Sequence, residues 1–204
     1  MEDMLQIASR YVTKIFGNQL PQGIIYHNLT HTKEVVETAK TIGGKSGINP
    51  DQMEMVILAA WFHDLGIIEN YNDHEEKSAE LCSEFLTKHR YPKNKIDTIV
   101  RIILSTRIPQ RPSNLLEEIL CDADLSHVGK KVFSSRSQLL RIEWENMRGK
   151  RFSDFEWLIT NIDFLLKNKF HTKYAKSLYD KQRKENLAAL QKKKLKMNKV
   201  GNAF

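Results

Sequence analysis

Residues 59–66 read Ala-Ala-Trp-Phe-His-Asp-Leu-Gly, and they place an imidazole, His63, beside a carboxylate, Asp64, at the end of an apolar run. The run is typical of a buried helix that begins after Asn49, an N-cap residue followed by proline at the first helical position. In helical phase both polar side chains continue the inward, apolar face of this helix. A buried carboxylate is costly, so this position requires hydrogen bonds, a cationic neighbour or a metal ion.

Two further segments repeat this placement. His31 stands at the start of one apolar stripe, and Asp124 stands at the end of another. The inward side chains that can bind a metal are therefore His31, His63, Asp64 and Asp124. Two imidazoles and two carboxylates suit a divalent ion of borderline to hard character, which would join three helices. Taken singly, an inward histidine is also typical of a hydrogen-bonded core residue, and an inward aspartate of a cap or an ion-pair partner.

Hydrophobic periodicity predicts helices along the whole chain and no strand. The first helix is expected over residues 3–16 with a stop at Gly17, the second ends at Gly43 and Gly44, and the third begins after Asn49. The fourth begins near Asp73, the fifth runs up to Ser105, and the sixth ends at Gly129. Two further helices cover about 132–148 and 153–168, and the last starts near 172 and fades at 191–194. Five prolines and nine glycines are few for a turn-rich β-fold. We predict an all-α fold, with one domain over residues 1–170 and a long basic helix or tail over residues 171–204.

The net charge of +7 belongs to the C-terminal segment. Residues 171–204 carry ten Lys or Arg against two acidic residues, a net of +8, which leaves −1 for residues 1–170. This segment is typical of a solvated helix, of a contact with an anionic membrane surface, of a nucleic-acid-binding region or of a lead into a further domain. It lacks interleaved aromatic residues, so sequence-specific nucleic acid recognition is not expected.

The cysteines and the apolar runs bear on location. Cys82 and Cys121 lie far apart and in no metal-ligand spacing, so we expect a reducing, cytoplasmic setting without disulfides. We expect no signal peptide before the first helix, and no apolar run approaches 18 residues. The chain as given is expected to be soluble.

The order of the four inward residues resembles the signature of the HD superfamily of metal-dependent phosphohydrolases, which is His, then His-Asp, then a distant Asp. The matching residues are His31 in His-Thr-x-x-Val, His63 and Asp64 in the stretch quoted above, and Asp124 in Asp-Ala-Asp-Leu. The resemblance covers roughly residues 25–130. It implies an HD-type helical bundle in which these four side chains hold a metal between helices.

Other segments are similar to particular branches of that superfamily. Residues 26–28 and 75–79 resemble one branch. The wording Asp-Ala-Asp-Leu-x-His-x-Gly from Asp122 and Thr-x-Tyr-Ala-Lys from Thr172 looks like the HD portion of bacterial proteins that continue into a membrane-anchored cyclic-nucleotide effector region. In those proteins a basic helix precedes transmembrane segments.

The resemblance also bears on the number of metal ions. Members with two ions add a histidine on the helix after His-Asp, which His74 matches, and another one helix later. Residues 105–107 read Ser-Thr-Arg, where that second histidine is expected. We therefore expect one divalent ion (Mn, Co, Ni, Fe, Mg or Zn), with His74 close to it; a second, weaker site through His74 stays open.

A phosphohydrolase mechanism assigns roles to the neighbouring residues. Glu75 and Asp64 are the expected catalytic groups, and His74, Lys77 and Arg107 are the expected substrate contacts. Glu75 would orient or deprotonate a water, and its alternative role is a first-turn carboxylate favoured by the helix dipole. Lys77 and Arg107 are phosphate-binding candidates or plain surface cations. Asp122 could orient His127 or a ligand, or be solvated, and His27 could support the loop before the first ligand.

Three functions compete at this stage. The first is a metal-dependent phosphomonoesterase or phosphodiesterase that cleaves a phosphoester of a nucleotide or a related small molecule. The second is a non-catalytic nucleotide-binding sensor whose basic tail couples to a membrane or a partner, and the third is a helical adaptor stabilised by a metal. The complete ligand set with Glu75 beside it favours the first. A small-molecule phosphate ester is the expected ligand, and a homodimer is a further expectation.

Overall fold

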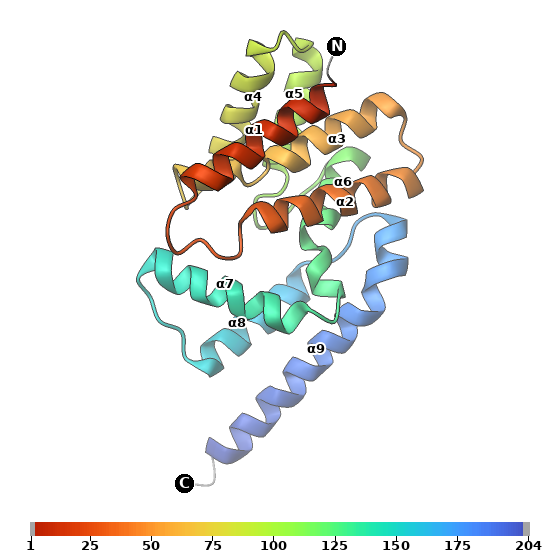
Figure 1. Cartoon of the computed structure of the whole chain (residues 1–204). Coiled ribbons are helices and arrows are strands. Elements are labelled where there is room, and N and C mark those ends of the chain that lie inside the picture. The colour runs from red at the N-terminus through yellow and green to blue at the C-terminus, as the bar shows by residue number, and fades with distance from the viewer. Residues whose placement is uncertain (1–2, 202–204) are drawn as a thin grey trace.

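The computed structural model describes residues 3–201, with side chains from residue 3 to residue 198. Within that range the chain has nine α-helices, two short 3-10 helices and no strand, which confirms the predicted all-α fold (Figure 1). The α-helices are α1 (Met4–Gln19), α2 (Leu29–Lys45), α3 (Pro50–Phe62), α4 (His74–Lys88), α5 (Lys93–Leu104), α6 (Leu115–Asp124), α7 (Phe133–Arg148), α8 (Asp154–Lys167) and α9 (Lys173–Gly201). The 3-10 helices are η1 (Leu65–Ile68), directly after the His-Asp pair, and η2 (Leu125–Gly129), directly after α6.

Polar caps begin the two helices that carry the first ligands. The side chain of Asn28 accepts hydrogen bonds from the backbone N–H groups of Thr30 and His31, at 2.8 and 3.2 Å. Asn49 and Gln52 form a reciprocal capping box at the start of α3, so the N-cap predicted there is confirmed. These caps place His31 in the first turn of α2 and begin the helix that ends beside His63.

Two of the predicted helix ends are wrong. Gly17 lies inside α1, and Gly43 lies inside α2, where a Cβ atom would come 3.0 Å from side-chain atoms of Ile48 and Met53. Gly43 therefore serves close packing and not termination. The glycine beyond the end of α2 with the left-handed backbone is Gly47, at φ 73°.

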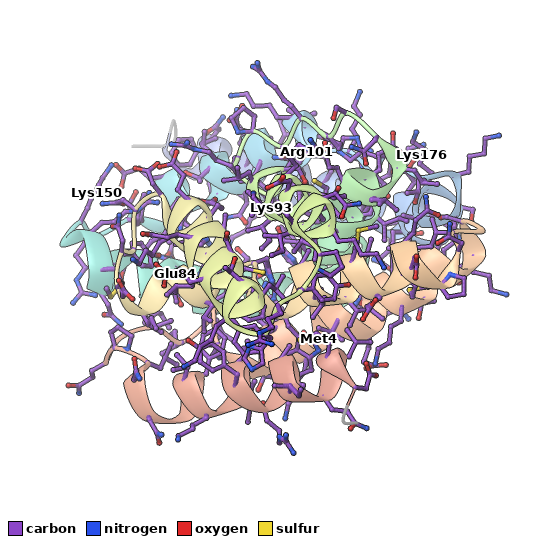
Figure 2. The ribbon with its side chains drawn as sticks, turned by 90° about the horizontal axis from the view of Figure 1, so that it is seen from above. Met4, Glu84, Lys93, Arg101, Lys150 and Lys176 are labelled. Atoms are coloured by element: carbon purple, nitrogen blue, oxygen red, sulfur yellow. The ribbon has the colours of Figure 1, made fainter. Side chains whose placement is uncertain are left out.

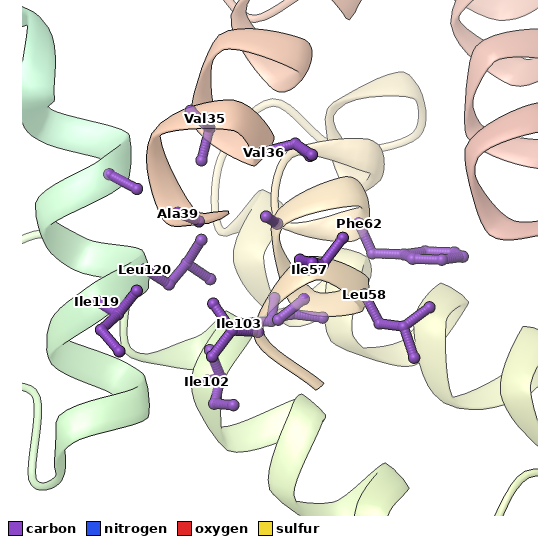
Figure 3. Close-up of a cluster of buried hydrophobic side chains, with 14 of the residues drawn as sticks. Val35, Val36, Ala39, Ile57, Leu58, Phe62, Ile102, Ile103, Ile119 and Leu120 are labelled. Carbon is purple, nitrogen blue, oxygen red and sulfur yellow. The ribbon is translucent and has the colours of Figure 1, made fainter. Parts of the chain in front are cut away.

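The core lies around α3. Figure 3 shows side chains of α3 packed among side chains of α2, α5 and α6. The labelled members, all of them buried, are Val35, Val36, Ala39, Ile57, Leu58, Phe62, Ile102, Ile103, Ile119 and Leu120. Each large aliphatic or aromatic side chain buried in this way contributes roughly 1.5–3 kcal/mol relative to exposure. The core therefore holds the ends of α2, α3 and α6, where the predicted ligands lie, in one place.

Helices α7, α8 and α9 lie on one side of this core (Figure 1). The first half of α9 packs closely against η2. A Cβ atom on Gly129 would lie 2.4 Å from Cβ of Tyr179, so the two residues are in tight contact. Arg183 donates to the carbonyl of Leu165 at 2.8 Å, and Asn186 donates to two carbonyls beside η2. The first half of the predicted basic helix is thus packed against the rest of the protein.

The end of the basic helix departs from the prediction. The chain stays helical past residues 191–194 as far as Gly201, because lysine, leucine and methionine favour helix and no proline interrupts them. Its lysine-rich end projects away from the other helices (Figure 1). Residues 202–204 of the segment expected over 171–204 lie outside the described residues.

Charged side chains surround the bundle. Figure 2 labels Glu84 on α4, Lys150 in the loop after α7 and Lys176 on α9, and all three side chains are exposed. Over residues 3–201, none of the helices combines the length and the apolar character that a membrane span needs.

A close backbone contact joins η1 to α4. The N–H of Gly66 donates to Oγ of Ser78 at 2.8 Å. A Cβ atom on Gly66 would lie 2.3 Å from the carbonyl oxygen of His74 and 2.5 Å from the backbone nitrogen of Ser78. Only glycine lets the turn after the His-Asp pair touch the start of α4, and this contact brings His74 and Glu75 to that pair.

We expect Gly66→Ala to destabilise the protein by about 3 kcal/mol, because the new methyl group meets backbone atoms that cannot move independently. Gly17→Ala is the matched control, since nothing lies within 4 Å of a Cβ atom there, and it should stabilise α1 by about 0.5–1 kcal/mol. Urea unfolding followed by circular dichroism measures both free energies. Equal changes in the two variants would show that the contact between η1 and α4 is not tight.

Candidate metal centre

The four predicted ligands come together at the ends of three helices. Nε2 of His31 lies 3.3 Å from Oδ2 of Asp64 and 3.3 Å from Oδ1 of Asp124. Nε2 of His63 lies 3.0 Å from Oδ2 of Asp64 and 3.9 Å from Oδ1 of Asp124. His31 belongs to α2, His63 caps the C-terminus of α3, and Asp124 ends α6. The four side chains that helical phase predicted to point inward therefore converge on one point.

The donor atoms at this point fit a cation. Within the described residues, Nε2 of His31, Nε2 of His63 and Oδ2 of Asp64 are buried without a hydrogen-bond partner. Nδ1 of His63 lies 2.8 Å from the carbonyl oxygen of Ala60, so a proton on Nδ1 leaves a lone pair on Nε2. Ligand atoms of His31, His63 and Asp124 all lie within 4.8 Å of one another. The donor set therefore has the composition and spacing that a divalent ion requires.

The electrostatics show the same need for positive charge. Burial alone would lower the pKa of His31, but its contacts with Asp124 and Asp64 raise that pKa to about 10. Burial would raise the pKa of Asp64, but the neighbouring imidazoles, His63 first among them, hold it well below its usual range. The buried carboxylate of Asp64 and the partly buried one of Asp124 thus require cationic charge, which protonated imidazoles or a bound ion can supply.

His74 and Glu75 lie at the edge of the centre. Nε2 of His74 is 3.4 Å from Oδ1 of Asp64 and 3.9 Å from Oε1 of Glu75. Burial lowers the pKa of His74, whereas contact with Asp64 raises it to about 9. Glu75 is buried in the first turn of α4 and lines the same cavity. Both residues therefore lie where the sequence predicted them, and their roles stay predictions.

The two predicted phosphate-binding cations are placed differently. Nζ of Lys77 lies between Glu69 and Glu80, at 3.0 and 2.9 Å, and Lys77 does not line the cavity that contains the metal centre. Arg107 does line that cavity, but its guanidinium pairs with Asp73 and with Glu76. The structure therefore brings Arg107, and not Lys77, to the site.

Asp122 is buried and its carboxylate is bonded to the start of α9, so the interpretations that it is solvated or that it orients His127 or a ligand are wrong. Its carboxylate accepts from the backbone N–H groups of His171 and Thr172 and from the hydroxyl of Thr172, at 2.7–2.8 Å. It thereby anchors the start of α9. His127 instead contacts the hydroxyl of Tyr26 at 3.1 Å, and burial lowers the pKa of His127 to about 4, so this imidazole is neutral.

Sequence reasoning missed Glu143, which organises the loop before the first ligand. This fully buried residue of α7 accepts hydrogen bonds from the backbone N–H groups of residues 25–27 at 2.7–3.0 Å. Its other oxygen contacts Nδ1 of His27 and the hydroxyl of Tyr71. The expected support of this loop by His27 thus runs through a buried carboxylate. The available signal was a charged residue between Leu140 and Met147 on one face of the helix.

Gln110 was also missed. Its side-chain amide donates to Oδ2 of Asp124 at 3.1 Å and contacts the carbonyl of Thr106 at 3.4 Å. It comes from the loop between α5 and α6, which no periodicity describes. The amide orients the aspartate so that Oδ1 faces the two imidazoles.

A cavity of about 580 Å³ opens from the metal centre. Asp64, Asp124, His74 and Glu75 line one part of it. The rest of the lining includes aromatic and basic side chains, among them Tyr71, Arg107, Trp144, Arg148 and Phe164. The volume is in the range of small-molecule sites, and the walls combine charged groups with flat aromatic faces.

Solved structures share this architecture. A protein from Lactobacillus plantarum superposes with a TM-score of 0.67 at 16% identity, over 97% of this chain and 98% of that one. YpgQ of Bacillus subtilis in complex with ADP gives 0.63 at 18% identity, over 93% and 95%. A predicted HD superfamily hydrolase from an uncultured Thermotogales bacterium gives 0.60 at 20% identity, over 90% and 89%. At these identities the likeness shows a common fold.

Sequence comparison identifies the family as well as the fold. The deoxyguanosinetriphosphate triphosphohydrolase-like protein of Clostridium tetani is 32% identical over 113 residues, which is 55% of this chain and 28% of that protein. The chain thus matches less than a third of this relative's length. The model of the HD domain matches residues 28–129, half of the chain, and that segment contains all four converging side chains. This match confirms the resemblance seen in the sequence, and the chain belongs to the HD domain family.

Proposed function

We propose that this protein is a metal-dependent phosphohydrolase that cleaves a phosphoester of a nucleotide. The observation that carries the proposal is a set of buried ligand atoms on His31, His63 and Asp64 that lack a hydrogen bond and lie beside Asp124 at the end of a cavity. The nucleotide class is supported by the name of the Clostridium relative and by the ADP bound to the Bacillus protein. His31, His63, Asp64 and Asp124 would hold one divalent ion.

Each nearby residue has a task in hydrolysis. A divalent ion held by these residues would supply Lewis acidity, which would lower the pKa of water and polarise a phosphoryl group. Glu75 accepts a proton as the water oxygen bonds to phosphorus and the bond from phosphorus to the leaving oxygen breaks. The leaving oxygen then takes up a proton from solvent, and Glu75 returns the proton that it accepted to solvent. His74 lies between Asp64 and Glu75 and keeps this carboxylate beside the centre.

Protein elements around the centre hold these groups in position. Glu143 fixes the loop that leads into α2, and Gln110 orients Asp124. The neutral imidazole of His127 and the ring of Tyr26 complete the wall of the cavity. The reacting groups therefore approach a substrate from a rigid surface, which is the arrangement that catalysis by positioning requires.

We expect the purified protein to contain about one divalent ion per chain, and His63→Ala or Asp124→Ala to lower its affinity for that ion more than tenfold, because each variant removes one of four donors. Lys77→Ala, outside the cavity, is the matched control and should keep the ion. Metal analysis after dialysis measures occupancy, and circular dichroism verifies folding. Full occupancy in both ligand variants would refute the assignment.

We expect Glu75→Gln to keep the ion and to lower kcat by about 10²–10⁴-fold, because the amide is isosteric but cannot accept the proton. Glu80→Gln, on the outer face of the same helix, should change kcat less than about twofold. Nucleoside mono-, di- and triphosphates and cyclic nucleotides are incubated with Mn²⁺, Co²⁺, Mg²⁺ or Ni²⁺, and the products are separated chromatographically. Wild-type turnover that Glu75→Gln retains in full would remove Glu75 from the mechanism.

The same panel tests the alternative function. A sensor would bind one of these nucleotides tightly and leave it intact with every metal. That result would contradict hydrolysis and favour nucleotide-dependent signalling.

A further inference from the structure

Two arginines line the cavity, and they differ in their partners. Arg107 pairs with Asp73 and Glu76, so its charge is already compensated by two carboxylates. Arg148, the last residue of α7, has no acidic partner among the residues whose side chains are described, and its guanidinium lies over aromatic rings. Arg148 is therefore the uncompensated cation of the described cavity wall.

Aromatic rings hold Arg148 in place. Its guanidinium carbon lies 4.2 Å from the centre of the Trp144 ring and 5.8 Å from the centre of the Tyr71 ring. Trp144 in turn packs edge-on against Trp157 at 5.5 Å, and the hydroxyl of Tyr71 donates to Oε1 of Glu143 at 3.2 Å. A guanidinium stacked on a ring engages its face and leaves the N–H groups along its edge free to donate.

The charges around the cavity call for such a group. Asp64, Asp124 and Glu75 line the metal end, and these carboxylates repel any phosphate that a bound ion does not neutralise. A nucleotide with more than one phosphate carries several negative charges. A free guanidinium fork matches two phosphate oxygens at once, and a stacked one loses little side-chain freedom on binding.

We propose that Arg148, held on Trp144 and Tyr71, binds a phosphate of the substrate that the metal centre does not bind. The inference rests on the proposed function, because it assigns the second end of the same cavity. It makes the substrate a compound with at least two phosphates. Residues 28–129, which match the family, supply the metal end, whereas Trp144 and Arg148 come from α7 beyond that segment. The guanidinium of this end is thus supplied by the part of the chain that follows the family segment, whereas Tyr71, which helps to hold it, lies within that segment.

Isothermal titration calorimetry of the full chain in Mg²⁺ buffer tests this assignment with two inert probes. The first is α,β-methylene-ADP, and the second is methylenediphosphonate, which has the two phosphorus groups without the nucleoside. Arg148→Ala should weaken both probes by about 10- to 100-fold, because it removes a charge-assisted bidentate contact. Arg148→Gln, similar in length, should do the same, and Arg148→Lys should lose less.

Arg151→Ala is the matched control. It removes the same charge three residues away, from a side chain that pairs with Glu145 and does not line the cavity, and it should leave both affinities within about twofold. Thermal unfolding of every variant verifies that the fold persists. Unchanged affinities in Arg148→Ala would overturn the assignment, and so would loss of the nucleotide probe alone or failure of the wild type to bind either probe.

Turnover separates this inference from the proposed function. If the wild type hydrolyses nucleotides while Arg148→Ala binds both probes normally, the inference fails and the hydrolase stands. If binding depends on Arg148 but no nucleotide is hydrolysed, the anion site stands and the hydrolase fails.

Discussion

The structure depends on two neighbouring carboxylates that need positive charge, one of them buried and the other partly buried. Asp64 and Asp124 lie against the imidazoles of His31 and His63 where three helices end. Carboxylates in such a place destabilise a fold unless cationic groups surround them, so the apolar packing of the helices and the chemistry of their ends are linked. The core around α3 holds the ends in register, and the cluster in turn restricts how those helices can move relative to one another.

Much of this could be predicted from local patterns. Helical phase is enough to show that His63 and Asp64 share the inward face of one helix, and the Asn49 cap marks where that helix begins. The order of His31, the His-Asp pair and Asp124 then identifies the family. Glycine was the weak signal: Gly17 and Gly43 resemble stops in sequence, but helix propensity and packing carry the backbone through both.

Other parts of the site could not be predicted, because they depend on contacts between distant segments. Asp122 looks like a companion of Asp124, yet it turns to the start of α9. Arg107 has the charge expected of a phosphate contact, but two carboxylates from α4 and its cap occupy it. The aromatic platform under Arg148 forms only when α7 folds against the loop that carries Tyr71. Hydrophobic periodicity predicts one helix at a time and gives no information about contacts between distant segments.

The hydrogen bonds that Glu143 makes to the loop before α2 have a consequence for the order in which the protein folds during synthesis. Its bonds to residues 25–27 join positions 116–118 residues apart in the chain. A nascent chain leaves the ribosome from its N-terminus, so all four converging side chains emerge before the residue that fixes the loop leading to the first of them. During synthesis the early helices can collapse around α3, but the entrance to the cavity stays unformed until α7 arrives. The centre reaches its final shape late, after most of the protein around it has been made.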